Sequence, residues 1–184
     1  MRKYSKQNQK VDLYSVKTEN LKKKQILSIC KLKNSFWRWT IKKQLEWYKK
    51  TVKKKDINNM LIINNNLAGY CLLRKRKAYQ NNKSFIYYYL DSFVINKKYR
   101  NNGSGRDFLL FNNKILKKVK KHSMLTCRKG VHNFYKKYGW KIIPKNKFQI
   151  MDHKSFWLKN KADLRVMIYN SNRKTTKKIF YYIN

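Results

Sequence analysis

The sequence predicts an α/β fold of the α+β kind, with a mixed, mostly antiparallel central sheet of about six or seven strands flanked by helices. Three observations lead to this prediction. Strand-like segments stand both before and after the helical ones, two adjacent segments have a hairpin pattern, and one crossover has the strand–helix–strand order that makes two strands parallel.

The N-terminal part predicts one strand and two helices. Residues 11–16 alternate apolar and polar side chains, as a half-buried strand does. A helix is expected over residues 21–32, with Asn20 as its N-cap. A second helix, lysine-rich on its outer face, is predicted from apolar residues at helical spacing: Trp37, Ile41, Leu45, Tyr48 and Val52.

The middle of the chain predicts strands. Residues 60–63 and 67–73 form a hairpin around an asparagine turn. Basic residues 74–77 and polar residues 80–84 are expected to form the next turn. The aromatic and β-branched run 85–95 then predicts a long central strand.

The C-terminal part predicts two helices and three strands. Phe108, Phe111, Ile115 and Val119 have helical spacing. A short helix is expected over residues 131–138, with Gly139 ending it as a C-cap. The expected strands are 123–127, 140–143 and 164–169.

Length and composition indicate one domain, residues 1–184, with a loose basic arm over about 1–8; 42% apolar content suffices for a core. The apolar runs are shorter than the ~20 residues of a membrane-spanning helix. The basic N-terminus lacks the hydrophobic region of a secretory signal, so we expect a cytoplasmic protein that does not contact membranes. It could be a monomer or a homodimer.

The formal charge of +39 has two possible origins. A basic surface attracts nucleic acid and other polyanions. However, the basic residues are mostly Lys, and Asn, Ile, Tyr and Phe are also abundant, so A/T-rich codon usage explains the pattern equally well. We therefore expect a weak electrostatic contact with nucleic acid, and only the net charge supports this expectation.

No metal site is expected. The three cysteines, Cys30, Cys71 and Cys127, form no Cys-x-x-Cys pair, and the three histidines have no metal-like spacing. We expect reduced, mostly buried thiols.

A glycine-containing segment follows the long predicted strand and leads into a helix: Tyr99, Arg100, Asn101, Asn102, Gly103, Ser104 and Gly105. Glycines allow a tight turn whose amides, at a helix N-terminus, can bind phosphate oxygens. Taken alone, these residues suit an ordinary strand-to-helix turn equally well. They match neither the Walker A nor the GxGxxG dinucleotide pattern.

A second segment, Phe134-Tyr135-Lys136-Lys137-Tyr138-Gly139-Trp140, stands farther along the chain. Together the two segments resemble the GCN5-related N-acetyltransferase (GNAT) superfamily, whose pattern is an Arg/Gln-x-x-Gly-x-Gly/Ala loop followed by Phe-Tyr-x-x-x-Gly-Phe/Trp. The resemblance covers roughly residues 67–143 well. It implies a GNAT-like sheet that is splayed at an acyl-CoA site.

The resemblance also implies an activity, the direct transfer of an acetyl group from acetyl-CoA to a primary amine. The coenzyme pyrophosphate would lie on the loop residues Arg100, Asn101, Asn102, Gly103, Ser104 and Gly105. The backbone of Phe93, Val94 and Ile95 would pair with the pantetheine arm. One departure is Arg128, which occupies a position where many members have a CoA-binding Asn.

Two residues match the catalytic positions of the family. Tyr135 would protonate the departing CoA thiolate, with Tyr138 as the substitute and core packing as the structural alternative. Asp91 would accept the amine proton. A carboxylate inside an apolar strand is costly unless it is hydrated or paired, so a structural ion pair with a nearby Arg or Lys is an equal alternative.

The resemblance places the acceptor between residues 37–47 and 157–169, where tryptophans would either line a pocket or pack in the core. Acidic residues are too few to favour an aminoglycoside, and the basic exterior better suits RNA-linked or ribosomal amines. The rival function is a non-enzymatic nucleic-acid-binding module that uses lysine runs at 22–24, 53–55 and 117–121.

Overall fold

A long antiparallel hairpin forms the centre of the computed structural model, which describes residues 9–151, 164–171 and 177–183. Its strands are β3 (Asn66–Gln80) and β4 (Lys83–Ile95). Asn81 and Asn82 join them with positive φ angles of 54° and 59°. This is the left-handed two-residue turn that matches the twist of a hairpin, and asparagine tolerates it.

Among the described residues, nine strands pair into one sheet in the order β1-β2-β3-β4-β5-β8-β6, with β9 pairing to β3 and β7. The other strands are β1 (Val11–Lys17), β2 (Ile57–Ile63), β5 (Ser123–Arg128), β6 (Lys141–Ile142), β7 (Phe148–Met151), β8 (Leu164–Tyr169) and β9 (Ile179–Tyr182). Within the described residues, only β4–β5 and β7–β9 are parallel. The predicted mixed, mostly antiparallel sheet is confirmed, with β7 and β9 added to the expected strands.

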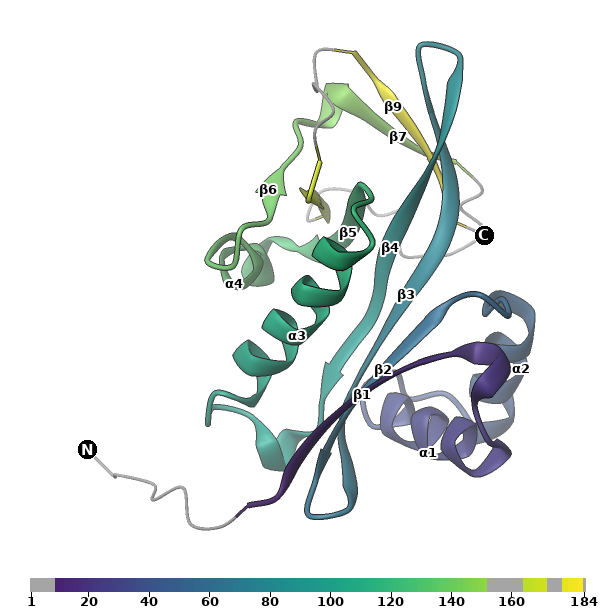
Figure 1. Cartoon of the computed structure of the whole chain (residues 1–184), viewed down its shortest axis with the longest axis vertical. Coiled ribbons are helices and arrows are strands. Elements are labelled where there is room, and N and C mark those ends of the chain that lie inside the picture. The colour runs from purple at the N-terminus through teal and green to yellow at the C-terminus, as the bar shows by residue number, and fades with distance from the viewer. Residues whose placement is uncertain (1–8, 152–163, 172–176, 184) are drawn as a thin grey trace.

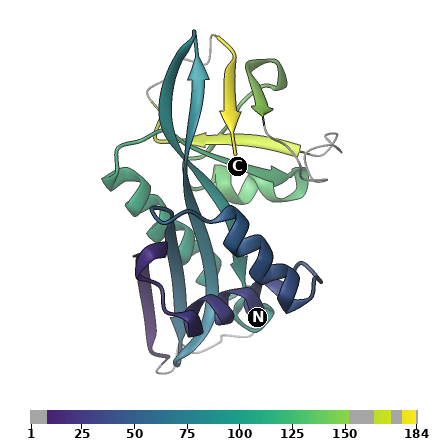
Figure 2. The ribbon, with the colours of Figure 1, turned by 90° about the vertical axis from the view of Figure 1, so that its right-hand side faces the viewer.

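Helices cover the sheet on both sides of the hairpin (Figure 1). On one side lie α1 (Lys23–Asn34) and α2 (Ile41–Thr51), packed on Met60, Tyr70, Leu72 and Val94. On the other lie α3 (Ser104–Lys118) and α4 (His132–Lys136), packed around Phe108, Tyr135 and Trp140. Figure 2 shows a third region, where the C-terminal strands cross near the distal half of the hairpin. All three cysteines are free and buried, as expected.

The turn predicted at residues 74–77 is wrong, because these residues continue β3. Arg74 and Arg76 are only 4% exposed, whereas Lys75 and Lys77 are exposed. The inward-facing arginines form ion pairs with Asp91 and Asp56, residues distant in sequence. The turn predicted at 80–84 is also shorter than expected. It consists of Asn81 and Asn82, because the polar residue Gln80 ends β3 and the charged residue Lys83 begins β4.

Both predicted N-terminal helices begin later than expected. Asn20 is not an N-cap but the last residue of a 3-10 helix (Thr18–Asn20). This short helix is held in place by the Thr18 N–H, which donates to Asp56 O. The α1 helix begins after Lys22, whose N–H donates to the Gln25 side chain. Trp37 precedes α2, which begins after Thr40, where the Thr40 hydroxyl accepts the Lys43 N–H.

No helix in the described part of the chain is both long and apolar enough to cross a membrane. The expected basic arm over residues 1–8, and Trp157 in the expected acceptor region, lie outside the described residues.

Candidate active site

The sheet opens between β4 and β5. The two strands pair only at Tyr88–Ser123, Tyr89–Met124 and Leu90–Leu125. Beyond these pairs β4 runs on to Ile95, while β5 stays paired with β8 as far as Arg128. Within the described residues, the β4 segment 91–95 therefore has β3 on one edge and no strand on the other. This splay lies where the sequence predicts one.

A β-bulge interrupts β4 inside the splay. Tyr70 pairs with Val94 but Leu72 pairs with Asp91, so Ser92 and Phe93 together oppose one residue of β3. Ser92 has φ +56°, a left-handed conformation that is uncommon for a non-glycine residue. Bulges redirect side chains and backbone groups, and they are frequent beside functional sites. Here the bulge places Phe93 among the aromatic side chains of α3 and α4. The centroids of the Phe93 and Phe108 rings are 5.5 Å apart.

The loop after β4 begins α3 with exposed backbone donors. Gly103 is its N-cap at φ +89°, a conformation that favours glycine. The Asn102 side chain accepts both the Ser104 N–H and the Ser104 hydroxyl. The N–H groups of Gly105 and Arg106 have no acceptor among the described residues, as is usual in a first helical turn. Free amides and the helix dipole suit a phosphate here.

The Arg100 side chain fixes this loop. Its Nε donates to Ile95 O at 3.0 Å, and its guanidinium lies 4.5 Å from the centroid of the Phe36 ring. Arg100 thus connects the end of β4 to the segment between α1 and α2. These contacts hold a positive charge beside the amides that begin α3.

Tyr135 lies on the α3 side of the bulge. It is 7% exposed, and its ring contacts Phe93 and Trp140 at centroid distances of 6.1 and 6.2 Å. Burial raises the pKa of the Tyr135 phenol far above its usual range, with smaller contributions from Cys71 and Cys127. The hydroxyl makes no hydrogen bond within the described residues and stays protonated at neutral pH.

Asn113 on α3 anchors this segment, and no sequence pattern points to it. Asn113 donates to Tyr138 O at 3.0 Å and accepts the Trp140 indole N–H at 3.0 Å. Gly139, between them, has φ +88° and little room for a side chain, because a Cβ would lie 3.2 Å from the Tyr169 ring. The Tyr-Gly-Trp segment thus connects α4, and with it Tyr135, to α3.

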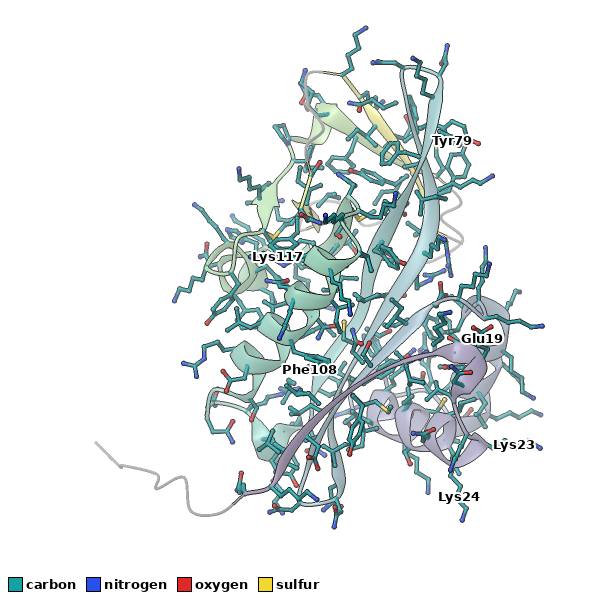
Figure 3. All side chains as sticks on the ribbon, in the orientation of Figure 1. Glu19, Lys23, Lys24, Tyr79, Phe108 and Lys117 are labelled. Carbon is teal, nitrogen blue, oxygen red and sulfur yellow. The ribbon has the colours of Figure 1, made fainter. Side chains whose placement is uncertain are left out.

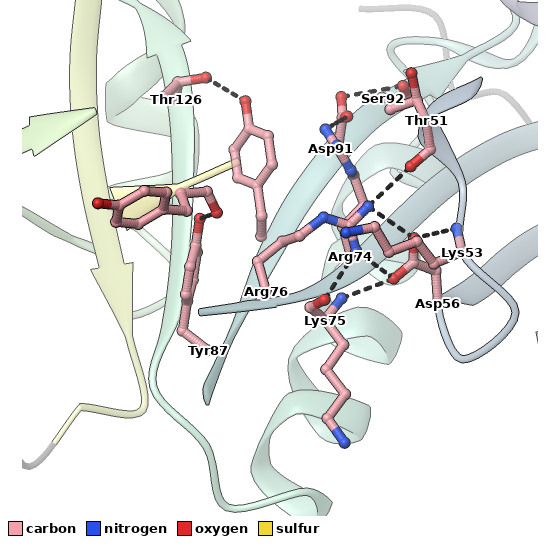
Figure 4. Close-up of polar contacts among 12 residues, drawn as sticks. Thr51, Lys53, Asp56, Arg74, Lys75, Arg76, Tyr87, Asp91, Ser92 and Thr126 are labelled. Atoms are coloured by element: carbon pink, nitrogen blue, oxygen red, sulfur yellow. Dashed lines mark hydrogen bonds and ion pairs between the residues drawn. The ribbon is translucent and has the colours of Figure 1, made fainter. Parts of the chain in front are cut away.

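Asp91 lies on the opposite face of β4. Its Oδ2 accepts Arg74 Nη1 at 3.1 Å, and its Oδ1 accepts the Ser92 hydroxyl at 3.1 Å (Figure 4). The Asp91 side chain is 20% exposed, so it keeps contact with solvent. The ion-pair alternative considered from the sequence is thus present, in a position that also flanks the bulge. Asp91 and Tyr135 approach the same interruption of β4 from its two faces.

A buried lysine lies on the same side of the sheet as Asp91. Lys33 of α1 is 3% exposed, and its Nζ lies 3.1 Å from the Trp47 ring centroid and 5.6 Å from that of Trp37. Burial lowers the pKa of Lys33 to about 8, although the charge of Asp91 opposes this shift. Trp37 and Trp47, which belong to the stretch expected to contact the acceptor, therefore lie beside this lysine.

Comparison with known proteins identifies the fold. No protein-family model matches this sequence, and no curated protein sequence matches it. Solved structures do match. An acyl-CoA N-acyltransferase from Pseudomonas aeruginosa aligns with a TM-score of 0.63 at 10% identity, covering 86% of this chain and 99% of that one. ElaA of Escherichia coli aligns at 0.60 and 9% identity, covering 86% and 99%.

Two further matches agree. The ribosomal-protein-S18-alanine N-acetyltransferase of Escherichia coli aligns with a TM-score of 0.57 at 14% identity, covering 85% of this chain and 92% of that one. An acetyltransferase of the GNAT family from Staphylococcus aureus also aligns at 0.57 and 14% identity, covering 85% and 98%. The fold is thus that of GCN5-related N-acetyltransferases, as the two sequence motifs predict.

Proposed function

We propose that the protein is an acyl-CoA-dependent N-acetyltransferase that transfers an acetyl group directly from acetyl-CoA to a primary amine. One observation carries the proposal: the splayed edge of β4, with its bulge at Ser92, leads directly to the glycine turn that begins α3. An extended thiol arm can pair with such an edge while the phosphates at its other end lie on helix N-terminal amides.

In this proposal the coenzyme contacts two stretches of backbone. The pyrophosphate lies on residues 100–105, where Gly103 allows the turn. The pantetheine arm follows Phe93, Val94 and Ile95. The Asn96 N–H donates to Ala68 O on β3. Because backbone groups alternate between the two edges of a strand, the N–H of Ile95 points into the splay.

The chemistry proposed is a direct displacement. The neutral amine attacks the thioester carbonyl, a C–N bond forms, and the C–S bond breaks. The departing thiolate takes its proton from the Tyr135 hydroxyl, which burial keeps protonated. The proton lost by the amine goes to Asp91, directly or through water. A general acid or base placed in this way contributes about 10²–10⁴ in rate.

Acetyl-CoA binding tests the proposal by thermal shift. At a hundredfold excess over its Kd a ligand stabilises its protein by about 2.7 kcal/mol, which corresponds to about 5–10 °C for a domain of this size. Gly103→Glu places a carboxylate in the phosphate turn and should abolish the shift.

The matched control is Asn81→Glu, which places the same side chain at an exposed residue that also has a positive φ, at the far tip of the β3–β4 hairpin. It should keep the wild-type shift. A wild-type protein without a saturable shift, or equal shifts in the wild type and Gly103→Glu, would refute the proposal. A panel of amines in the same assay identifies the acceptor.

A further inference from the structure

A groove of about 630 Å³ lies along a free stretch of β3, away from the splay. β2 pairs with β3 up to Leu73, and β9 pairs with it only at Ala78 and Tyr79. Residues 74–77 have β4 on one edge and, within the described residues, no strand on the other. The loop 53–56 forms one wall of the groove, and Tyr79 and Tyr182 lie at its distal end.

The groove has a positive charge. Asp56 is the one carboxylate among its described lining residues, and Arg76 already neutralises it. Asp56 forms a bidentate ion pair with Arg76, Nη1–Oδ1 at 2.7 Å and Nη2–Oδ2 at 3.0 Å. Both side chains are at most 2% exposed. The lysines around this pair are exposed: Lys54, Lys55, Lys75 and Lys77. Their charge is therefore directed to solvent and is not opposed from within the groove.

The same ion pair holds the groove in shape. Asp56 also accepts the backbone N–H groups of Lys53 and Lys75, each at 2.9 Å, and Arg76 donates to Thr51 O (Figure 4). One carboxylate thus connects the loop wall to the edge of β3. A cavity whose walls are joined by buried, charge-assisted hydrogen bonds is preorganised for a ligand.

An exposed aromatic ring, that of Tyr79, lines the groove together with its lysines. Tyr79 is 37% exposed and extends outward from the hairpin (Figure 3). Its ring packs edge-on against Tyr182 at a centroid distance of 5.5 Å. A held ring beside spaced lysines is the arrangement on which unpaired bases stack while their phosphates meet cations. An acidic peptide would use the lysines but leave the ring unused.

We propose that this groove binds single-stranded nucleic acid. Net charge alone would not single it out, because the whole chain carries +39. The groove is singled out by three features together: its hollow shape, the Asp56 carboxylate that is already paired with Arg76, and the exposed Tyr79 ring. This site is separate from the proposed coenzyme site, and its assay contains no acetyl-CoA, so it succeeds or fails independently of the acetyltransferase proposal.

Fluorescence anisotropy with a labelled oligouridine of about ten nucleotides tests the site. The variant Lys75→Glu/Lys77→Glu should weaken binding at least about tenfold and make the salt dependence shallower by about one unit of log–log slope. The control, Lys23→Glu/Lys24→Glu, makes the same change in net charge on exposed α1 residues (Figure 3). It should weaken binding less than about threefold.

Tyr79 provides the second readout. Tyr79→Ala should weaken binding about fivefold or more, whereas Tyr79→Phe, which keeps the stacking face, should bind like the wild type. Equal losses in the two double-glutamate variants would overturn the proposal, because binding would then be diffuse. An unaffected Tyr79→Ala variant, together with equally tight binding of polyglutamate, would also overturn it in favour of an acidic protein partner.

Discussion

Arg74 Nη1 donates to Asp91 Oδ2 at 3.1 Å, on the face of β4 opposite Tyr135. The Nε and Nη2 groups of Arg74 are buried without a hydrogen-bond partner within the described residues, so Asp91 is the one carboxylate that pairs with this guanidinium there. The Tyr89 ring also lies beside it, with its centroid 5.7 Å from Arg74 Cζ. A carboxylate with this partner and 20% exposure can be a proton acceptor, a structural counter-ion or both. Variants of Asp91 separate the two roles.

Asp91→Asn should lower turnover by about 10²–10⁴ if Asp91 accepts the amine proton, with acetyl-CoA affinity unchanged. The loss should be measured per folded molecule, since the buried Arg74 also loses its counter-ion. Asp56→Asn is the matched control, because it removes the carboxylate from the other Arg–Asp pair of β3. If both variants lose stability and neither loses turnover, Asp91 has only a structural role.

Tyr135→Phe should lower turnover by about 10²–10⁴ while leaving acetyl-CoA affinity nearly unchanged, because only the proton donor is removed. Because burial raises the pKa of Tyr135, the hydroxyl stays protonated at alkaline pH, and turnover should not fall between pH 7 and about 10 through its ionisation. Tyr138→Phe is the control. Normal turnover in Tyr135→Phe with a loss in Tyr138→Phe would transfer the role to Tyr138.

Lys33 should make stability depend on pH. Its folded pKa is lowered to about 8, while the unfolded chain keeps the proton to about pH 10. Between these values the unfolded state binds more protons, so folding stability rises with pH. Relative to Lys33→Met, the wild type should gain at most about 3 kcal/mol from pH 7 to about 10.5, reduced by the attraction of the Trp47 ring for the cation.

Urea denaturation of both proteins across this pH range measures the Lys33 effect. The large net charge affects both proteins alike, so the difference between them isolates Lys33. A difference that stays constant with pH would show that Lys33 keeps an ordinary pKa.

Gly139→Ala should destabilise the protein more than Gly103→Ala. Both glycines have φ near +88°, so each alanine carries a left-handed backbone cost of about 1–2 kcal/mol. At Gly103 the nearest atom to a Cβ is 3.7 Å away, whereas at Gly139 the Tyr169 ring is at 3.2 Å. That ring stacks on Trp140 and must move. Equal losses in urea denaturation would contradict the packing argument.

Local patterns were enough to predict much of the fold. The strand predicted at 164–169 coincides with β8, and that at 123–127 lies within β5. The short helix predicted over 131–138 is present as α4, but it ends at Lys136 with Lys137 as its C-cap, and Gly139 follows in a left-handed conformation. These features depend on side-chain alternation and on glycine, which a single sequence displays directly.

Other features depend on residues that meet only in the folded chain. Arg74 and Arg76 look like turn residues until Asp91 and Asp56 are placed beside them. Asn113 is one of many asparagines, and only its contact with Trp140 distinguishes it. The bulge at Ser92 has no sequence signal, because a left-handed serine is an exception to the usual backbone preference.

The predicted site residues lie around the splay and the bulge of β4. The backbone of Phe93, Val94 and Ile95 lies on the splayed edge, and the turn at 101–105 follows it along the chain. Asp91 and Tyr135 flank the bulge between them. Their roles in binding and catalysis stay predictions, which the variants above test.

The most direct test of a coenzyme in the splay is an NMR titration of backbone amides with acetyl-CoA. A coenzyme bound in the splay should cause saturable shifts at Phe93, Val94, Ile95 and Gly103–Gly105, with the amides of Lys75, Lys77 and Tyr79 unaffected. Shifts confined to Lys75, Lys77 and Tyr79 would contradict it, because the phosphates would then be attracted only by the lysines of the groove.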